Sequence, residues 1–344
     1  AILPEGTIMN AVEPVAVGMR TLACTLAQTV TLGAFCRALP DRMPASPASS
    51  VTLMNIKTST RAGRPIMASV GPVGGGAGGS AFGDGADGSG ANLSFLKNTP
   101  VEISEAEIPV RIKRYGLVPD SGGPGEYRGG TGLEMELQLD QPQSMVTARN
   151  RDRSVISAWG LRGGRSGAVS RFVKNPDTAG SIELGSQDLV KCDPGDVILI
   201  QGPGAGGYGS PLDRPVEKVL ADVRQGLVSA DRAKSDYGVV IAADGGVDQA
   251  ATVQLRGQLR SDADGAEFGH GPGRLAFEAV WTEARYDALT GILAKLPVTW
   301  RYFVKHEIFR QIQGPPVDGS DGANEVYRAY TQVTDRFADL PKAS

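Results

Sequence analysis

The chain has 344 residues, of which 41% are hydrophobic and 21% charged, so it can bury a sizeable core and wholesale disorder is not expected. Its 35 basic and 38 acidic residues leave a formal net charge of −3, which gives no reason to expect a nucleic-acid-binding protein. Three cysteines are too few for a disulfide framework, which favours a cytoplasmic setting. No apolar run approaches the roughly 18 residues of a membrane span, so no membrane partner is expected.

In chain order, the first predicted element is a helix over residues 20–39, where apolar side chains recur at helical spacing. Cys24 and Cys36 lie in this pattern and are expected in the core. Residues 63–90 are rich in glycine, alanine, serine and aspartate, which is typical of a loop or of a very tight packing site lined by glycine. Apolar side chains then alternate with Glu and Gln over residues 133–139, which predicts a half-buried strand.

Strand and helix patterns follow each other in the rest of the chain. The expected elements are a strand at 197–200, helices beginning near Pro215 and at Ser229, a strand around Val253, and helices over 282–296 and 300–309. The composition changes near residue 245, which suggests two domains, 1–245 and a partly helical extension 246–344. These elements predict a mixed α+β fold with a largely antiparallel sheet, long glycine-rich loops and a mostly helical C-terminal tail.

Side chains that could bind a metal ion or act as a nucleophile are scarce. The two histidines, His270 and His306, lack metal-ligand spacing, so no metal site is expected within this chain. No G-x-S-x-G elbow is present for a serine nucleophile. Cys192 follows a lysine and precedes an aspartate in a predicted turn, where it would be exposed, but one exposed cysteine does not make a mechanism.

Two stretches match the dinucleotide pattern G-x-G-x-x-G, at 74–79 and 204–209. No helix pattern follows the first stretch. The second lacks the acidic residue expected at the end of a following strand, because Asp222 lies within the next helix instead. With 46 glycines in the chain, chance matches are expected, and we predict no dinucleotide site.

The loop over residues 119–132 is the most specific segment, with one Asp, one Ser and one Arg among many glycines. Its backbone N–H groups could form an anion nest, and Arg128 could clamp a carboxylate or phosphate. In the alternative, Asp120 caps a turn and Arg128 ties two loops together through an internal salt bridge. The residues alone leave both interpretations open.

Asp120 to Gly130 reads Asp-Ser-Gly-Gly-Pro-Gly-Glu-Tyr-Arg-Gly-Gly and resembles the hallmark motif of the hydantoinase B/5-oxoprolinase family. Further motifs of that family match in order and spacing: Asn98 to Glu105, Trp159 to Gly164, Gly204 to Arg214, Asp222 to Ser229 and Tyr237 to Val240. Pro4 to Asn10 resembles a segment near the middle of family members. The chain is therefore expected to be the C-terminal portion of a B-type subunit.

The resemblance implies an ATP-dependent enzyme with two kinds of subunit. A hydantoinase-A-type partner would bind ATP and Mg²⁺ and phosphorylate an amide or enolate oxygen. The B-type subunit would then hydrolyse a cyclic amide, with Zn²⁺ or Mn²⁺ expected, if anywhere, in its N-terminal half. Two alternatives remain: a subunit of a related ketone carboxylase of the acetone or acetophenone type, or a non-catalytic assembly module of either enzyme.

The same resemblance indicates the site. Asp120, Ser121 and Arg128 are expected to be catalytic. The residues expected to bind substrate or phosphate are Gly122, Gly123, Gly129, Gly130, Glu102 and Glu105. The small-molecule partner would be a cyclic amide or a ketone, and the protein partners would be the A-type subunit and the N-terminal half of the B-type subunit.

Overall fold

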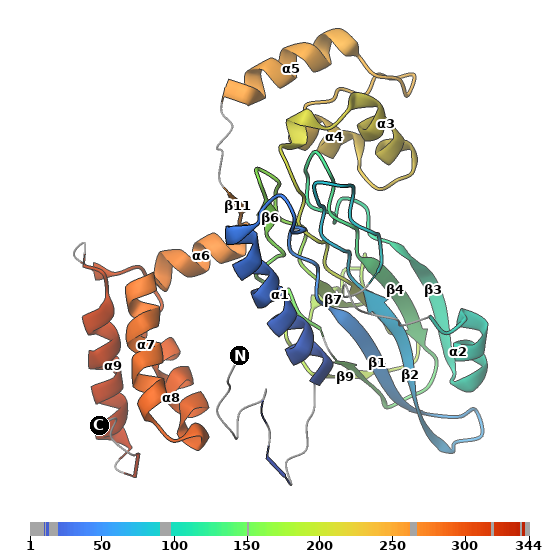
Figure 1. The fold of residues 1–344 in the computed structure, drawn as a ribbon. Helices are drawn as coiled ribbons and strands as arrows, with labels where there is room; N and C mark the ends of the chain where they lie inside the picture. The colour runs from blue at the N-terminus through green and yellow to red at the C-terminus, as the bar shows by residue number, and fades with distance from the viewer. Residues whose placement is uncertain are drawn as a thin grey trace. The chain divides into compact units, whose positions relative to one another are not determined.

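A computed structural model describes residues 10, 12–13, 20–89, 98–149, 151–261, 267–317, 320–337 and 339–340. The chain divides into one unit over Gly18–Gly271 and a second that includes Pro272–Ser344 (Figure 1). Each unit is described by itself. The segment from Pro4 to Met9, which contributed to the family resemblance, lies outside the described residues. The predicted α+β class with antiparallel sheets and a helical C-terminal region is confirmed.

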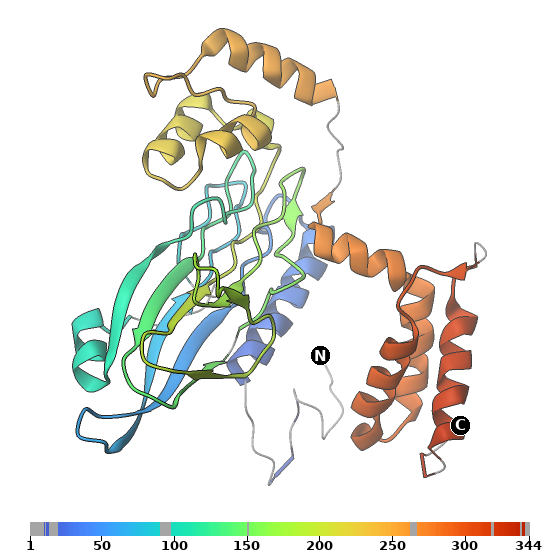
Figure 2. The same ribbon diagram turned by 180° about the vertical axis from the view of Figure 1, so that it is seen from behind.

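Two antiparallel sheets form the centre of the first unit (Figures 1 and 2). The four-stranded sheet has the order β2 (Pro65–Gly74), β1 (Val51–Ser59), β5 (Ser144–Arg149) and β9 (Leu189–Cys192). The five-stranded sheet has the order β3 (Val110–Leu117), β4 (Leu133–Leu139), β10 (Val197–Gln201), β7 (Arg171–Lys174) and β8 (Ile182–Glu183). The predicted strands at 133–139 and 197–200 are β4 and β10, which pair with Leu137 opposite Ile198.

A single apolar core joins the two sheets. Its fully buried side chains come from strands of both: Met54, Ile56, Val73, Leu137, Leu139, Val146, Ile198 and Ile200. Cys192, at the end of β9, also lies in this core, so its predicted exposure is wrong. Burial raises the pKa of its thiol to about 11, the opposite of what a reactive thiolate needs. Cys24 is exposed on α1, so its predicted place in the core is wrong too, whereas Cys36 is buried as expected.

The helices described in the first unit are α1 (Arg20–Ala38), α2 (Val101–Glu107), α3 (Val216–Arg224), α4 (Ala230–Tyr237) and α5 (Gln249–Ser261), with a short 3₁₀ turn at Pro211–Asp213. The sequence patterns predict α1, α3 and α4, whereas α2 lies where the chain was expected to become β. The strand predicted around Val253 is wrong, because this residue lies in α5. The Ala, Gln, Leu and Arg residues around it favour helix and outweigh two β-branched positions.

Four glycine-rich segments lie at or beyond the ends of the sheet strands: residues 74–79, 122–132, 160–167 and 202–209. Within the stretch 63–90, residues 65–74 form β2 and not a loop, and the third segment begins with the short strand β6 (Gly160–Leu161). The four segments pack backbone against backbone. A methyl group on Gly76 would lie 1.9 Å from the carbonyl oxygen of Gly130, and one on Gly204 would lie 1.6 Å from that of Ser121. Because no side chain fits between segments this close, the glycine content of the sequence is explained by packing. We call this region the glycine layer.

The second unit is helical, as predicted for the C-terminal region. It contains α6 (Pro272–Val280), α7 (Glu283–Lys295), α8 (Val298–Gln311) and α9 (Ala323–Arg336). Thr282 caps α7 by accepting a hydrogen bond from the backbone N–H of Arg285. Leu289, Ile308 and Val326 are buried in its own apolar core. No described helix is both long and apolar enough to cross a membrane.

Candidate functional site

The loop over residues 119–132 connects β3 to β4 and lies beside the helices α3 and α4. Asp120 has a left-handed backbone conformation, with φ 60°. Its Oδ1 accepts a hydrogen bond of 2.7 Å from the backbone N–H of Ser229, the residue that caps α4. Its own N–H donates to the carbonyl of Leu227 at 2.9 Å. Asp120 therefore fixes the loop to the turn that leads into α4.

Ser121 is buried, with 1% of its surface exposed. Its hydroxyl donates to the carbonyl of Val118 at 2.7 Å and accepts from the N–H of Gly132 at 3.0 Å. These two bonds close the loop across its ends. Because both the donor and an acceptor site of the hydroxyl are used, Ser121 acts in this structure as a clamp on the loop.

Arg128 is 3% exposed and points into the protein. Its Nη1 and Nη2 donate to the two carboxylate oxygens of Asp87 at 2.9 and 3.2 Å, a bidentate pair. Asp87 also accepts hydrogen bonds from the N–H and hydroxyl of Thr131. The structure therefore has the internal salt bridge that the sequence left as one of two interpretations.

Arg214 makes a second bidentate pair a short distance away. This residue is 1% exposed, and its Nη1 and Nη2 donate to Asp84 at 2.7 and 2.9 Å. On its other edge, Nε donates to Asp222 at 3.0 Å. Asp222 lies 3.7 Å from Nε of Arg128, so one carboxylate on α3 joins the two arginines.

These five residues form what we call the charge cluster: Asp84, Asp87, Arg128, Arg214 and Asp222. Arg128 comes from the hallmark loop, and Arg214 and Asp222 come from later motifs. Tyr237 of a fourth motif, on α4, lies close enough for the charges of the cluster to act on its hydroxyl. Tyr237 is 1% exposed, and its hydroxyl has no hydrogen-bond partner within the described residues. Sequence analysis missed Asp84 and Asp87, whose signal was two aspartates within a glycine-rich run.

The cluster reaches the surface only through its outer carboxylates, with 31% of the Asp84 side chain and 25% of the Asp87 side chain exposed. Partial burial disfavours their ionised forms, but the bonds from Arg214 and Arg128 outweigh it and hold the pKa of each carboxyl below its usual value. Both are therefore charged at neutral pH.

The four glycines predicted to bind substrate or phosphate lie in the glycine layer. The N–H groups of Gly123, Gly129 and Gly130 donate to the carbonyls of Ala205, Gly123 and Ala77, at 2.8 to 2.9 Å. A methyl group on Gly122 would lie 2.1 Å from the carbonyl oxygen of Gly129. Three of the four N–H groups are thus used inside the fold, and the role of these glycines in binding stays a prediction.

Glu102 and Glu105 are not brought together with the loop. They lie on α2, which precedes β3, whereas the loop follows β3 (Figure 1). The strand between them has 8 residues, which corresponds to roughly 25 Å at the rise of a strand. Glu105 accepts a hydrogen bond from the N–H of Ile112 at 2.7 Å and so anchors α2 to β3.

The second G-x-G-x-x-G segment is also part of the glycine layer. The N–H groups of Gly204, Gly206 and Gly207 donate to the carbonyls of Ala168, Ser46 and Arg165. They do not point together toward an open anion site, as a dinucleotide loop requires. In the part of the chain that the structure describes, no group of three or more His, Cys, Asp or Glu side chains could hold a metal ion.

A family model described as hydantoinase B/oxoprolinase matches residues 1–211. The chain belongs to this family. Among curated members, it is 36% identical to the beta subunit of the caprolactamase of Pseudomonas jessenii over 72% of its length, and 27% identical to a putative D-/L-hydantoinase B subunit of a Pseudomonas species over 74%. It spans 44% and 43% of those two relatives, so it covers less than half of each.

Two solved structures resemble the fold of this chain. The ATP-dependent caprolactamase of Pseudomonas jessenii matches with a TM-score of 0.60 at 32% identity, over 75% of this chain and 46% of that one. Nucleotide-free acetone carboxylase matches with a TM-score of 0.61 at 21% identity, over 98% of this chain and 47% of that one. At that lower identity, the second match concerns the fold alone.

Proposed function

We propose that this chain is the C-terminal part of a B-type subunit in an ATP-dependent enzyme that hydrolyses a cyclic amide. Its similarity to the caprolactamase beta subunit carries the proposal. Transfer of the terminal phosphoryl group of ATP to the amide oxygen would make the ring carbon electrophilic toward water. After water adds, the ring C–N bond would break with the amine as leaving group, and a second water would release phosphate from the resulting acyl phosphate. An A-type subunit would bind ATP and Mg²⁺, and the N-terminal half of the B-type subunit would complete the site, with Zn²⁺ or Mn²⁺ if a metal takes part.

Within this enzyme, we assign the hallmark loop a positioning role. Arg128 is buried and its two terminal nitrogens are paired with Asp87, so contact with a substrate would require that pair to break. The outer edges of Asp84 and Asp87 are the parts of the charge cluster that a substrate or a partner could reach. The prediction that Asp120, Ser121 and Arg128 touch the substrate stays a prediction, and their hydrogen bonds favour the positioning role.

Reconstitution tests the function. The chain is combined with an A-type subunit and the N-terminal half of a B-type subunit, and ring opening of caprolactam, hydantoin and 5-oxoproline is followed with and without ATP. We expect ATP-dependent opening of at least one ring. An assembled complex that consumes no ATP with any cyclic amide would contradict the proposal.

Two substitutions of Asp120 distinguish a positioning role of this residue from a catalytic one. Asp120→Asn keeps a side-chain oxygen for the N–H of Ser229 and tolerates the left-handed backbone, so we expect unfolding free energy within about 0.5 kcal/mol of wild type. Asp120→Ala loses the bond and strains the backbone, and should cost about 1–3 kcal/mol. A positioning role predicts near-normal turnover for Asp120→Asn in the assembled enzyme. A large loss of turnover at unchanged stability would instead identify the carboxylate as catalytic.

Ketone carboxylation is the second candidate. The match to acetone carboxylase extends over nearly the whole chain, including the C-terminal helices, although it supports the fold only. The assay is incorporation of labelled bicarbonate into acetone or acetophenone by the same assembled complex. Incorporation without opening of any cyclic amide would replace the first proposal with this one.

The third candidate is a module that organises its partners without a catalytic side chain of its own. The ion pairs of Arg128 with Asp87 and of Arg214 with Asp84, both inside the protein, are consistent with such a module. Substitutions in the hallmark loop would then change the amount of assembled complex but not the turnover per complex. Measuring both quantities for Arg128→Ala distinguishes this module from a subunit that contributes to turnover.

A further inference from the structure

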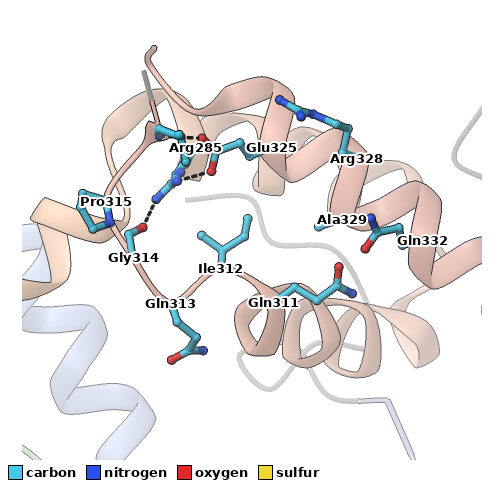
Figure 3. A pocket seen from close by; sticks show the side chains of 11 residues that line it. Arg285, Gln311, Ile312, Gln313, Gly314, Pro315, Glu325, Arg328, Ala329 and Gln332 are labelled. Atoms are coloured by element: carbon cyan, nitrogen blue, oxygen red, sulfur yellow. Dashed lines mark hydrogen bonds and ion pairs between the residues drawn. The ribbon is translucent and has the colours of Figure 1, made fainter. Parts of the chain in front are cut away.

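The C-terminal unit has a groove of its own, between α9 and the segment that follows α8. Its volume is about 550 Å³, in the range of small-molecule sites in proteins. Figure 3 shows Ile312 in the middle, with Arg285 and Glu325 toward one end and Gln311 and Gln332 toward the other. No family motif of the sequence lies in this groove.

The first end of the groove is built around a buried arginine. Arg285 is 1% exposed and pairs with Glu325. Its Nη1 also donates to the carbonyls of Val280 and Gly314, the second at 2.7 Å (Figure 3). Glu325 in turn accepts a hydrogen bond of 3.1 Å from the N–H of Val317. These bonds tie α7, α9 and the segment after α8 together, so the shape of this end is set before any ligand binds.

The groove carries an unbalanced positive charge. Glu325 forms its ion pair with Arg285. The backbone hydrogen bond that Glu325 accepts lowers the pKa of its carboxyl, and the charge of Arg328, one turn further along α9, helps to lower it from a longer distance. Two cations thus share one carboxylate among these three residues. The Nε of Arg328 donates a long hydrogen bond, 3.4 Å, to the carbonyl of Asn324. Arg328 lines the groove and is exposed, so its guanidinium is available to an anion.

The remaining lining is amide and apolar. Gln311 and Gln332 each offer a primary amide, which both donates and accepts hydrogen bonds. Between the polar ends, Ile312 and Ala329 are 7% and 5% exposed and supply an apolar floor. A small molecule with a carboxylate, a short apolar stem and an amide would complement these groups.

We propose that the groove binds a small anion of the N-acyl or N-carbamoyl amino acid class. Its carboxylate would pair with Arg328, its stem would lie over Ile312, and its amide or ureido group would bond to Gln311 and Gln332. Ring opening of a hydantoin yields a member of this class, so the groove fits a product of the reaction proposed above. The binding itself does not rest on that reaction.

Calorimetric titration of the 344-residue chain with N-carbamoylglycine tests the proposal, with two partial probes alongside. Propionate has the carboxylate without the ureido group, and N-acetylglycinamide has amides without the carboxylate. We expect saturable binding of N-carbamoylglycine and a dissociation constant about tenfold higher, or more, for each partial probe.

Substitutions then locate the site. Arg328→Gln removes the exposed cation of the groove and should raise the dissociation constant for N-carbamoylglycine about tenfold or more. Arg274→Gln on α6 is the matched control, because this arginine pairs with Glu278 and does not line the groove. We expect the control to bind like wild type, with the same helix content by circular dichroism in both variants.

Three results would overturn the proposal. They are the absence of saturable binding, equal binding of propionate and N-carbamoylglycine, and binding that Arg328→Gln leaves unchanged. The second would mean that the groove attracts any carboxylate. None of these outcomes bears on cyclic-amide hydrolysis, which is measured separately in the assembled enzyme.

Discussion

At position 76, a neighbouring backbone carbonyl lies so close that only glycine fits. A methyl group would lie 1.9 Å from the oxygen of Gly130, far inside the contact distance of carbon and oxygen, and the obstacle is backbone that cannot rotate away. The same holds across the glycine layer, where several segments touch through their main chains. At residue scale, glycine is therefore a packing requirement in this fold.

Gly76→Ala tests this requirement. Separating two backbone segments should lower the unfolding free energy by about 3 kcal/mol or more, which urea denaturation measures. Gly257→Ala is the control, because nothing lies within 4 Å of a methyl group at that position in α5. Because alanine favours a helix more than glycine does, the unfolding free energy of the control should rise by up to about 1 kcal/mol. Equal effects at both positions would contradict the packing argument.

The charge cluster predicts a pH dependence. Asp84 and Asp87 have lowered pKa values in the folded state, so they bind protons more weakly when folded than when unfolded. Their contribution to stability is complete above the unfolded value, about 4, and is lost as the pH falls through it toward the folded values. Asp87→Asn should lower stability at pH 7 and flatten the acid branch of the stability curve.

The control for that experiment is Asp231→Asn, the same change of charge at an exposed position on α4. Stability is measured by urea denaturation between pH 7 and pH 3. If both variants lose the same amount at every pH, Asp87 contributes through net charge only and the paired geometry is irrelevant.

At the scale of elements, the helices and strands predicted from local sequence are present except for the strand at Val253, but other elements such as α2, α9 and β1 were not predicted. β4 and β10 have alternating or continuous apolar residues that a strand buries, and α4 has a serine cap and a glycine stop. The strand predicted at Val253 is wrong because the alternation of Val253 and Leu255 is a weak signal beside several strong helix formers. The prediction that Cys192 is exposed is wrong because its burial depends on which face of β9 packs against the other sheet.

The cap of α4 gives a prediction at this scale. The Ser229 hydroxyl accepts a hydrogen bond of 3.2 Å from the N–H of Arg232. Ser229→Ala should cost about 1 kcal/mol of unfolding free energy. Ser235 lies within the same helix, away from its N-cap, and is exposed, so Ser235→Ala should leave the unfolding free energy unchanged or raise it slightly. A loss at Ser235 equal to that at Ser229 would show that the cap contributes nothing specific.

At the scale of the whole molecule, the apolar core between the two sheets and the core of the C-terminal helices share no residue. Leu137 is fully buried between the sheets, and Ile308 is fully buried among the C-terminal helices. Separate cores in separate units are expected to unfold separately. The sheet unit is the part that carries the family motifs and the charge cluster.

Calorimetry of paired variants tests this. Leu137→Ala and Ile308→Ala each remove a fully buried side chain and should each cost about 2–5 kcal/mol. We expect each variant to lower the midpoint of one thermal transition and to leave the other in place. A single transition that shifts in both variants would show that the two units unfold as one.

The sequence by itself determined the family, the α+β class and the positions of the elements with the clearest local patterns, such as α4 and β10, because those depend on local periodicity, caps and ordered motifs. Only the tertiary structure decided how the hallmark residues are used. Residues 84, 87, 128, 214 and 222 meet through contacts between distant segments. Spacing along a chain carries no information on whether an arginine such as Arg128 faces a ligand or an internal carboxylate, because the packing of the intervening segments sets its direction.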